Sequence, residues 1–379
     1  MNDAIRTGHH LEYTQVVSYT AEEALINGSM PNGNLIQFLL DRNTQQSTEF
    51  CSPDNTLWRR QYRERHPTEI AALKCMDGRL NLSVITKTPP GIIQPYRNIG
   101  GMFDFGWPYF GELINDWVDY AVSQGRDCLL LITDHYAKGD KHRGCRGFKY
   151  DIQTSREHTL KLKREAERIY GARHVVVYPV QVTIETDEDA LIIRNGEREL
   201  NLATGNGLST DDLRQRIREL FPDMKLEMIE DFLPLLEGNL RHIQEVRAMN
   251  RPLVDTEHRE HILVIGRGVD WLHIPNVALI IGPYSFNLGE PIATAGKILL
   301  DNLESGRIPK DGGVLIMASA ACRNMNGHYR AQAERKAKSM LDFSLQTIAA
   351  DVPQLAPYIQ HIAGITDLNT RRFIPVELT

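Results

Sequence analysis

Two cysteines and a histidine in the first half of this chain have the residue types and the setting of metal ligands. Cys75 lies in the short apolar run 72–79, His135 ends a second apolar run, and Cys145 follows a loop of Gly, Lys and Arg. Two thiolates and one imidazole are ligands that suit Zn²⁺, and a tetrahedral site built from them keeps its fourth position for water or a carboxylate. The sequence therefore predicts a catalytic zinc site.

A second histidine, His142, competes with His135 for the imidazole position. His135 ends a predicted strand, where a rigid element can fix a ligand, whereas His142 lies in the Gly/Lys/Arg loop. We therefore favour His135 as the ligand. If His142 is not the ligand, two roles remain open for it: a solvated side chain, or a proton-transfer group near the mouth of the site. Cys75 taken alone would be a small buried residue of an apolar strand.

Asp77 and Arg79 follow Cys75 at intervals of two residues. If the strand continues that far, the three side chains project to the same side. A bidentate pair between Arg79 and Asp77 would keep the carboxylate ionised and aimed at the site. The competing interpretation is a structural ion pair. Farther along, Gly100 and Gly101 would allow the backbone to approach a substrate closely.

The elements that must position these residues alternate as in an α/β protein. Apolar runs predict strands at 72–79, 91–101 and 128–135. Between the last two, the apolar spacing within 112–124 predicts a helix. No short hairpin signal separates these elements, which favours crossover connections and a parallel sheet. Ligands of such sheets gather at the carboxyl ends of the strands, where Cys75 and His135 would lie.

The second half of the chain repeats this pattern of elements. The run 261–268 aligns with 71–78. In that register Ile265 stands at the position of Cys75, and an alanine stands at the position of His135, so the second copy would keep the core and lack the ligands. A chain of 379 residues also favours two domains over one. The predicted units are an amino-terminal helical extension (1–54), a zinc-binding catalytic domain (55–200) and a degenerate repeat (201–379).

Composition and charge exclude several classes of function. The chain is 42% hydrophobic and 24% charged, as is ordinary for a globular protein. A net charge of −6, with no basic run interleaved with aromatic residues, argues against nucleic-acid binding. We expect no signal peptide and no membrane span, because no stretch is apolar enough. Five cysteines do not suggest a disulfide framework, so we expect a cytoplasmic protein whose thiols can bind metal.

Two of these motifs resemble sequence hallmarks of the β-class carbonic anhydrases. The stretch 75–79, Cys-Met-Asp-Gly-Arg, is similar to the Cys-x-Asp-x-Arg motif of that family. The stretch 97–101, Arg-Asn-Ile-Gly-Gly, is similar to its Arg-Asn-Ala-Gly loop. A strand that leads to His and Cys ligands completes the resemblance, which covers roughly residues 55–200. A fused pair with metal residues in only one copy is similar to the carboxysomal shell carbonic anhydrases.

The chain departs from the family pattern at the histidine. The family usually has His-x-x-Cys directly after the strand. Here the strand ends at His135, and His-x-x-Cys occurs seven residues later as His142-Arg-Gly-Cys145. The two histidines therefore remain alternatives.

The resemblance implies reversible hydration of CO₂ to bicarbonate by a zinc-activated hydroxide that the Asp77–Arg79 dyad orients, with Gly100 and Gly101 beside the substrate. It also implies a β-carbonic-anhydrase-like, mostly parallel sheet flanked by helices, duplicated within the chain as a pseudo-dimer. Such chains would form homo-oligomers in the cytoplasm or in a carboxysome-like compartment. Asp77 could instead ligate the metal and switch the site off.

Two other functions remain open on the same fold. One is hydrolysis of carbonyl sulfide or carbon disulfide, since nothing in the motifs separates these small linear electrophiles from CO₂. The other is a non-catalytic zinc-binding scaffold or sensor.

Overall fold

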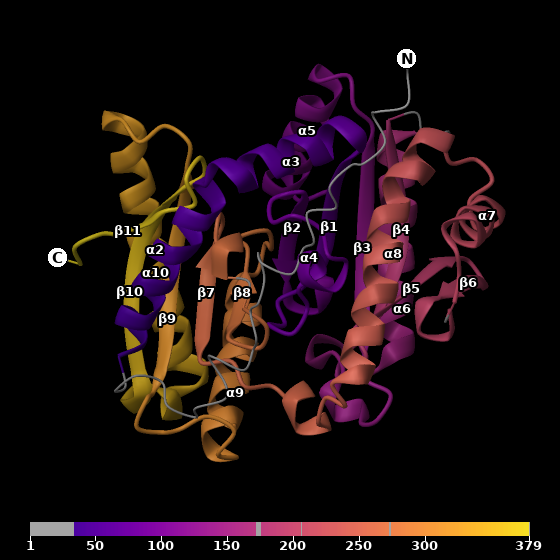
Figure 1. Cartoon of the computed structure of the whole chain (residues 1–379). Helices are drawn as coiled ribbons and strands as arrows, with labels where there is room; N and C mark the ends of the chain where they lie inside the picture. Colours follow the sequence, from indigo (N-terminus) through magenta and orange to yellow (C-terminus); the bar gives the residue numbers. More distant parts are fainter. Residues whose placement is uncertain (1–33, 172–175, 206, 273, 379) are drawn as a thin grey trace.

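The structure is a computed structural model that describes residues 34–171, 176–205, 207–272 and 274–378. In this part of the chain two sheets lie side by side, with helices on both faces (Figure 1). No helix among the described residues has the length and apolar character that a membrane crossing requires. The amino-terminal extension predicted for 1–54 falls largely outside these residues.

The first sheet contains the strands β1 (Glu69–Cys75), β2 (Ile93–Asn98), β3 (Cys128–Tyr136), β4 (Val177–Glu185), β5 (Ala190–Asn195) and β6 (Arg198–Asn201). Their spatial order is β2-β1-β3-β4-β5-β6. The first four strands pair in parallel, and β5 and β6 add an antiparallel edge. The prediction of an α/β fold with a mostly parallel sheet is therefore confirmed.

The second sheet contains the strands β7 (Ile262–Gly266), β8 (Ala278–Ile281), β9 (Val314–Cys322), β10 (Ile359–Asp367) and β11 (Phe373–Pro375). Its order is β11-β10-β9-β7-β8, with only β11 antiparallel. Read from β8, the succession β8-β7-β9-β10-β11 has the same order and the same strand directions as β2-β1-β3-β4-β5 of the first sheet.

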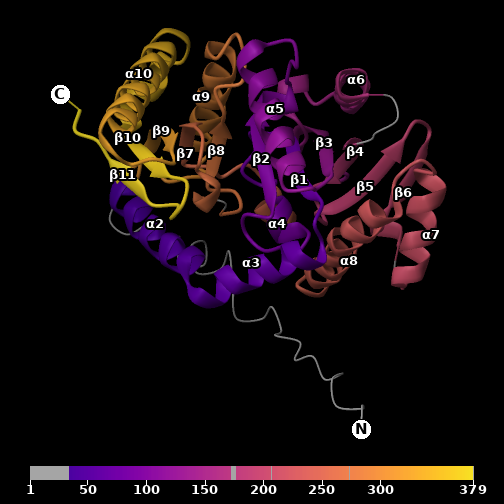
Figure 2. The same ribbon diagram turned by 90° about the horizontal axis from the view of Figure 1, so that it is seen from above.

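Two layers of helices cover the sheets. The helices are α2 (Leu35–Cys51), α3 (Pro53–Arg65), α4 (Leu82–Ile85), α5 (Pro108–Ser123), α6 (Ile152–Tyr170), α7 (Thr210–Leu220), α8 (Leu226–Ala248), α9 (Gly289–Glu304) and α10 (Gly327–Asp351). Figure 2 shows α5, α6, α9 and α10 on one side of the sheets, and α2, α3, α4 and α8 on the other.

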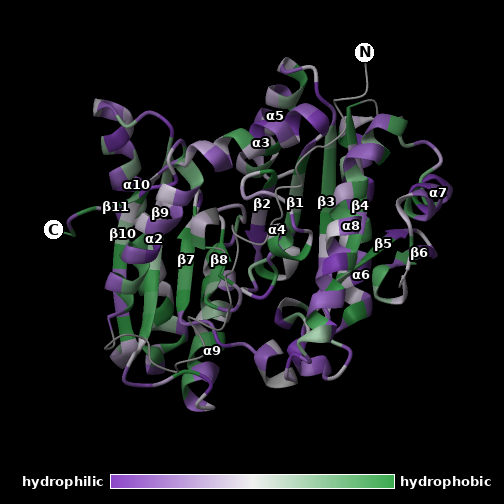
Figure 3. Cartoon of the chain, in the orientation of Figure 1, coloured by the Kyte–Doolittle hydropathy of each residue, from purple (hydrophilic) through white to green (hydrophobic). Residues whose placement is uncertain are grey.

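Strands that are covered on both faces must be apolar on both faces. In β1, Ala71 and Leu73 join the apolar cluster that contains residues of α5 and α6, whereas Ile70 and Ala72 join the cluster that contains residues of α8. Figure 3 shows the central strands, such as β3 and β4, as largely apolar and the outer helix faces as polar. This explains why the strands appear in the sequence as unbroken apolar runs.

Helix α8 belongs to the first sheet, although the sequence places it after the predicted boundary near residue 200. The amide of its buried Asn239 donates hydrogen bonds to the carbonyls of Ile85 (2.9 Å) and Asp189 (2.8 Å). The same side chain accepts one from the backbone N–H of Leu191 (2.9 Å). The first layered unit therefore continues to about the end of α8, and the second sheet begins only with β7. A boundary at residue 200 would separate this sheet from the helix that covers one of its apolar faces.

The two sheets meet through backbone hydrogen bonds along their facing edges. The N–H of Ile280 donates to the carbonyl of Met76 (3.0 Å), and the N–H of Gly282 donates to that of Arg97 (2.8 Å). Helix α2 reinforces the second sheet, because its Asn43 bonds to the backbone of Arg371 and Phe373. The carboxyl end of β1 therefore lies against the second half of the chain.

Candidate metal centre

Three side chains from separate segments converge at the carboxyl end of the first sheet. Cys75 is the last residue of β1, His135 is the last but one of β3, and Cys145 follows in the next loop. The two sulfur atoms are 4.0 Å apart, and one ligand atom from each of the three residues lies within 4.8 Å of the others. Two sulfurs bound to one tetrahedral Zn²⁺ at about 2.3 Å would be about 3.8 Å apart. The geometry therefore fits a shared ion.

The chemistry of these three residues also fits a metal. All are buried, with exposed fractions of 5% for Cys75, 2% for His135 and 3% for Cys145. Neither ring nitrogen of His135 has a hydrogen-bond partner among the described residues. Buried polar atoms without partners are rare because they cost free energy. A metal ion would give one of these nitrogens its missing partner.

The two thiols and the imidazole influence one another's ionisation. The contact with Cys145 holds the pKa of Cys75 well below its ordinary value, although burial opposes this. The same contact and burial raise the pKa of Cys145. Burial acts to lower the pKa of His135, but the neighbouring Cys75 and Asp77 outweigh it and raise that pKa. The two thiols thus share one proton, which a metal ion bound to both sulfurs would displace.

The structure brings His135 to the thiols and leaves His142 at the surface. His142 is exposed, lies in the short 3-10 helix Lys141–Arg143, and its ring contacts that of Tyr150 at 5.3 Å between centroids. The departure from the spacing of the family therefore does not prevent a three-ligand cluster, because the strand end itself supplies the imidazole.

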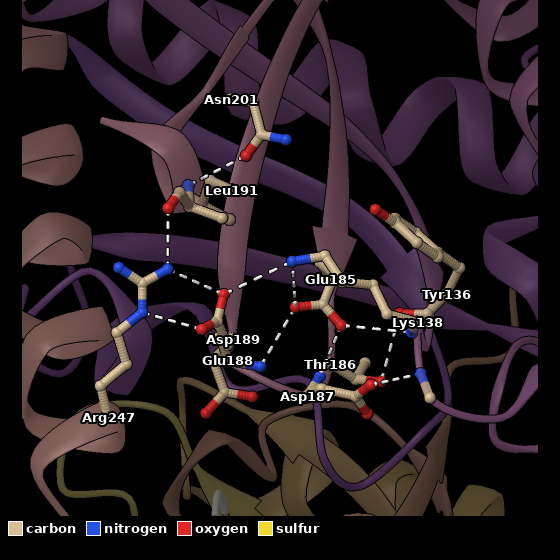
Figure 4. A network of polar contacts seen from close by, with 12 residues as sticks. Tyr136, Lys138, Glu185, Thr186, Asp187, Glu188, Asp189, Leu191, Asn201 and Arg247 are labelled. Carbon is tan, nitrogen blue, oxygen red and sulfur yellow. Dashed lines mark hydrogen bonds and ion pairs between the residues drawn. The ribbon is translucent and has the colours of Figure 1, made fainter. Parts of the chain in front are cut away.

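The loop that carries Cys145 is fixed by an acidic turn between β4 and β5 (Figure 4). Asp187 accepts hydrogen bonds from the backbone N–H of Gly139 (2.7 Å) and from the guanidinium of Arg143 (2.8 Å). Glu185, at the end of β4, accepts bonds from the N–H groups of Asp187 (2.8 Å) and Glu188 (3.2 Å). The turn therefore ties the connection between His135 and Cys145 to the sheet.

The paired glycines are explained by close packing beside the candidate metal ligands. Gly100 and Gly101 have φ values of +61° and +66°, which favour glycine. A Cβ on Gly100 would lie 2.8 Å from the ring of Phe148, and one on Gly147 would lie 2.9 Å from the nitrogen of Gly100. The turn at Gly100 and Gly101 therefore packs directly against the segment that follows Cys145. A contact of Gly100 and Gly101 with substrate remains a prediction.

Asp77 and Arg79 form the expected pair, but not on a strand. β1 ends at Cys75, so the expectation of a continuing strand is wrong. The chain turns instead, and Asp77 accepts bonds from the backbone N–H of Arg79 (2.9 Å), from its Nε (3.0 Å) and from its Nη2 (2.5 Å). Oδ2 of Asp77 lies 3.8 Å from Nε2 of His135. The carboxylate thus sits beside the cluster while the guanidinium holds both of its oxygens.

The second half of the chain completes this pair. Arg79 donates to the carbonyl of Thr256 (2.7 Å), and its Nη2 lies 3.2 Å from Nε2 of His258. Nδ1 of His258 in turn lies 3.0 Å from the carboxylate of Glu260, which also accepts a bond from the N–H of Gly78 (3.1 Å). These residues were not among those predicted from the sequence. His258 is 179 positions from Arg79, and no local motif marks it.

These contacts determine the charges around Asp77. Burial alone would raise the pKa of Asp77, but the guanidinium of Arg79 and the imidazole of His258 hold it well below its ordinary value. Burial likewise opposes ionisation of Glu260, and His258 reverses the effect so that the pKa of Glu260 falls. Asp77, His258 and Glu260 also lie close enough together to be considered as a metal site. Here, however, the guanidinium of Arg79 already pairs with the charge of Asp77.

No protein-family model matches the chain, and no curated protein matches it. The site must therefore be interpreted from its own geometry.

Proposed function

We propose that this protein is a zinc-dependent carbonic anhydrase of the β type, which catalyses the reversible hydration of CO₂ to bicarbonate. One observation carries the proposal. Cys75, His135 and Cys145 converge at metal-ligand distances, directly beside a carboxylate that a bidentate guanidinium holds.

Cys75, His135 and Cys145 would hold the zinc and leave the fourth position to water. When bound, zinc lowers the pKa of a coordinated water to about 7 and so supplies the nucleophile at neutral pH. Asp77 stays ionised beside the site and can accept a hydrogen bond from the attacking oxygen, which aims a lone pair at CO₂. Arg79 keeps Asp77 in that orientation, and Thr256 and His258 hold Arg79 from the other half of the chain.

The shared strand order of the two sheets supports an internal duplication with one active copy. β7 has Ile265 where the first copy has Cys75. By the strand pairing, Ser319 of β9 stands where the first copy has His135, one residue before the alanine of the sequence alignment. The second half would then stand where a second subunit stands in a dimer. This arrangement predicts one zinc per chain.

Zinc content and CO₂ hydration, measured together by metal analysis and stopped-flow, test the proposal. Wild type should contain one zinc and hydrate CO₂. His135→Ala should lose zinc and activity, whereas His142→Ala, a matched change at an exposed histidine, should keep both. Loss of zinc in His142→Ala alone would overturn the choice of ligand but not the class of enzyme. Absence of zinc from wild type would refute the metal centre.

The same experiment separates the competing functions. Release of sulfide from carbonyl sulfide without hydration of CO₂ would favour the hydrolase. Stoichiometric zinc with no activity between about pH 7 and 9 would favour a scaffold or sensor whose site stays closed.

A further inference from the structure

A small cavity lies in the second half of the chain, at the carboxyl ends of its parallel strands. Its volume is about 170 Å³. Gly266 and Arg267 at the end of β7, Gly282 after β8 and Arg323 after β9 line it, together with residues of β2 and of the turn between β10 and β11. Strand ends of this kind are where parallel sheets bind ligands. The cavity therefore lies at the carboxyl ends of the strands of the second sheet, just as the cluster of Cys75, His135 and Cys145 lies at the carboxyl ends of the first.

The lining of the cavity is rich in positive charge. Four arginines are among its lining residues: Arg97, Arg267, Arg323 and Arg371. Nη2 of Arg97 donates to the carbonyl of Leu80 (3.2 Å), and the guanidinium of Arg371 lies over the ring of Phe50. No aspartate or glutamate is among the described residues that line it. In the alignment of the two halves, Arg267 stands opposite Asp77, so the carboxylate position of the first copy carries a guanidinium in the second.

Two of these arginines have no countercharge among the residues that the structure describes. Within the described ranges, neither Arg267 nor Arg323 forms an ion pair. The side chain of Arg267 lies near the phenol groups of Tyr96, Tyr109 and Tyr284. Arg267 is only partly exposed, and partly buried charges usually have a partner of opposite sign. An anion bound in the cavity would supply a partner of opposite sign.

The backbone around Arg267 is held in place. Its N–H donates to the carbonyl of Ser319 (3.2 Å), and the hydroxyl of Ser319 donates back to its carbonyl (3.3 Å). Gly266 has a φ of +139°, and a Cβ there would lie 1.9 Å from the carbonyl oxygen of Ser319. Gly268 has a φ of +79°. The guanidinium thus projects from a rigid turn, which lowers the entropic cost of binding.

The size of the cavity indicates what part of a ligand it can enclose. Its volume is smaller than the roughly 300 Å³ at which sites for whole drug-sized molecules begin. It is large enough for one tetrahedral oxyanion with a few waters, since each water takes about 30 Å³. Arg323 and Asn369 are exposed at its edge, so a carrier attached to the anion could extend into solvent.

From these observations we infer that the cavity is a second ligand site, specific for a phosphate group, whether as inorganic phosphate or as the monoester of a small molecule. Guanidinium groups bind phosphate oxygens in bidentate fashion, and several of them favour a dianion over a monoanion such as chloride. The site is separate from the zinc cluster and does not depend on the proposed activity.

Titration calorimetry on the full-length protein tests the inference. The probes are inorganic phosphate and glycerol 3-phosphate, at constant ionic strength set with chloride. Both should bind to wild type at one site per chain. Arg267→Gln and Arg323→Gln should each weaken binding by at least about tenfold, because each removes charge-assisted hydrogen bonds. Arg335→Gln, an exposed arginine of α10 outside the cavity, should bind as wild type does.

Each outcome decides between the possibilities. Tighter binding of glycerol 3-phosphate assigns a phosphorylated metabolite, and binding of inorganic phosphate alone assigns the free anion. Absence of binding by both probes, or equal binding in Arg267→Gln, Arg323→Gln and wild type, would overturn the site. Zinc content and circular dichroism should be unchanged in the variants, which separates loss of this site from failure of the zinc centre or of folding.

Discussion

At the scale of single residues, the centre depends on charges that are buried together. The side chains of Asp77 and Arg79 are 3% and 6% exposed. Neither could be buried alone without a large desolvation cost, and each satisfies the other's hydrogen-bonding groups. His258 and Glu260 form a further polar contact next to this pair, so that the Glu260 carboxylate is not buried alone either. The pair is therefore a requirement of folding as well as a device for orienting a carboxylate.

Replacing Arg79 should destabilise the protein strongly. Arg79→Ala leaves the Asp77 carboxylate buried without its guanidinium, which typically costs about 3 to 5 kcal/mol. Urea unfolding followed by circular dichroism measures the loss. Arg60→Ala is the control, because the Arg60–Glu64 pair is exposed and such pairs contribute little. An equally small change in both variants would contradict the buried-pair argument.

At the scale of elements, helix α8 and the turn after β4 are joined by a second buried carboxylate. Asp189 lies 3.0 Å from Nε2 of His242 on α8 and accepts a bond from Arg251 (2.7 Å). Burial would raise the pKa of Asp189, but these two partners outweigh it and lower the pKa. The contact fixes α8 on the first sheet next to the turn that holds the loop of Cys145.

This contact makes part of the stability depend on pH. Because the pKa of Asp189 is lower in the folded than in the unfolded chain, the unfolded chain takes up the proton first as the pH falls. The stabilisation is present above the unfolded value of about 3.9 and is lost as the pH falls through the folded value.

Asp189→Asn tests this linkage. The difference in unfolding free energy between wild type and Asp189→Asn should therefore be large at pH 7 and shrink toward pH 3. Urea unfolding at several pH values measures it. Asp342→Asn, at an exposed site on α10, should show no such trend. A difference independent of pH would mean that Asp189 acts by packing alone.

At the scale of the whole molecule, neither half is complete by itself. Arg79 of the first half bonds to Thr256 of the second, and backbone bonds join the facing edges of the two sheets. Figure 2 shows α2 and α3 running along one side from the second sheet to the first. The chain therefore folds as one unit in which the second half supports the candidate metal centre of the first.

A chain cut after residue 200 should fail to form a stable first half. It would lack α8, which covers one apolar face of the first sheet, and the carbonyl of Thr256 that binds Arg79. We expect it to aggregate or to bind a dye for exposed apolar surface, and to lack zinc. A chain that ends at Val376 is the control and should fold with its zinc. A monomeric, zinc-bound fragment 1–200 would show that the second half is dispensable.

The sequence by itself determined the features that depend on neighbouring residues. Apolar runs identified strands such as β1 and β3, because strands covered on both faces must be apolar throughout. The residue types at 75, 77, 79, 135 and 145 predicted a metal site of thiolates and imidazole with an adjacent ion pair, a ligand set that suits zinc. The choice between His135 and His142 could be argued only from the expected rigidity of a strand end.

Only the tertiary structure decided which distant groups meet. It brought His135 to the thiols, turned the chain so that Arg79 faces Asp77, and supplied His258 from a segment 179 positions away. It also assembled four arginines from separate strand ends around one cavity. The physical reason is that burial, and with it the need for a partner of opposite charge, is a property of the packed molecule. A sequence shows the charge of a side chain but not what surrounds it.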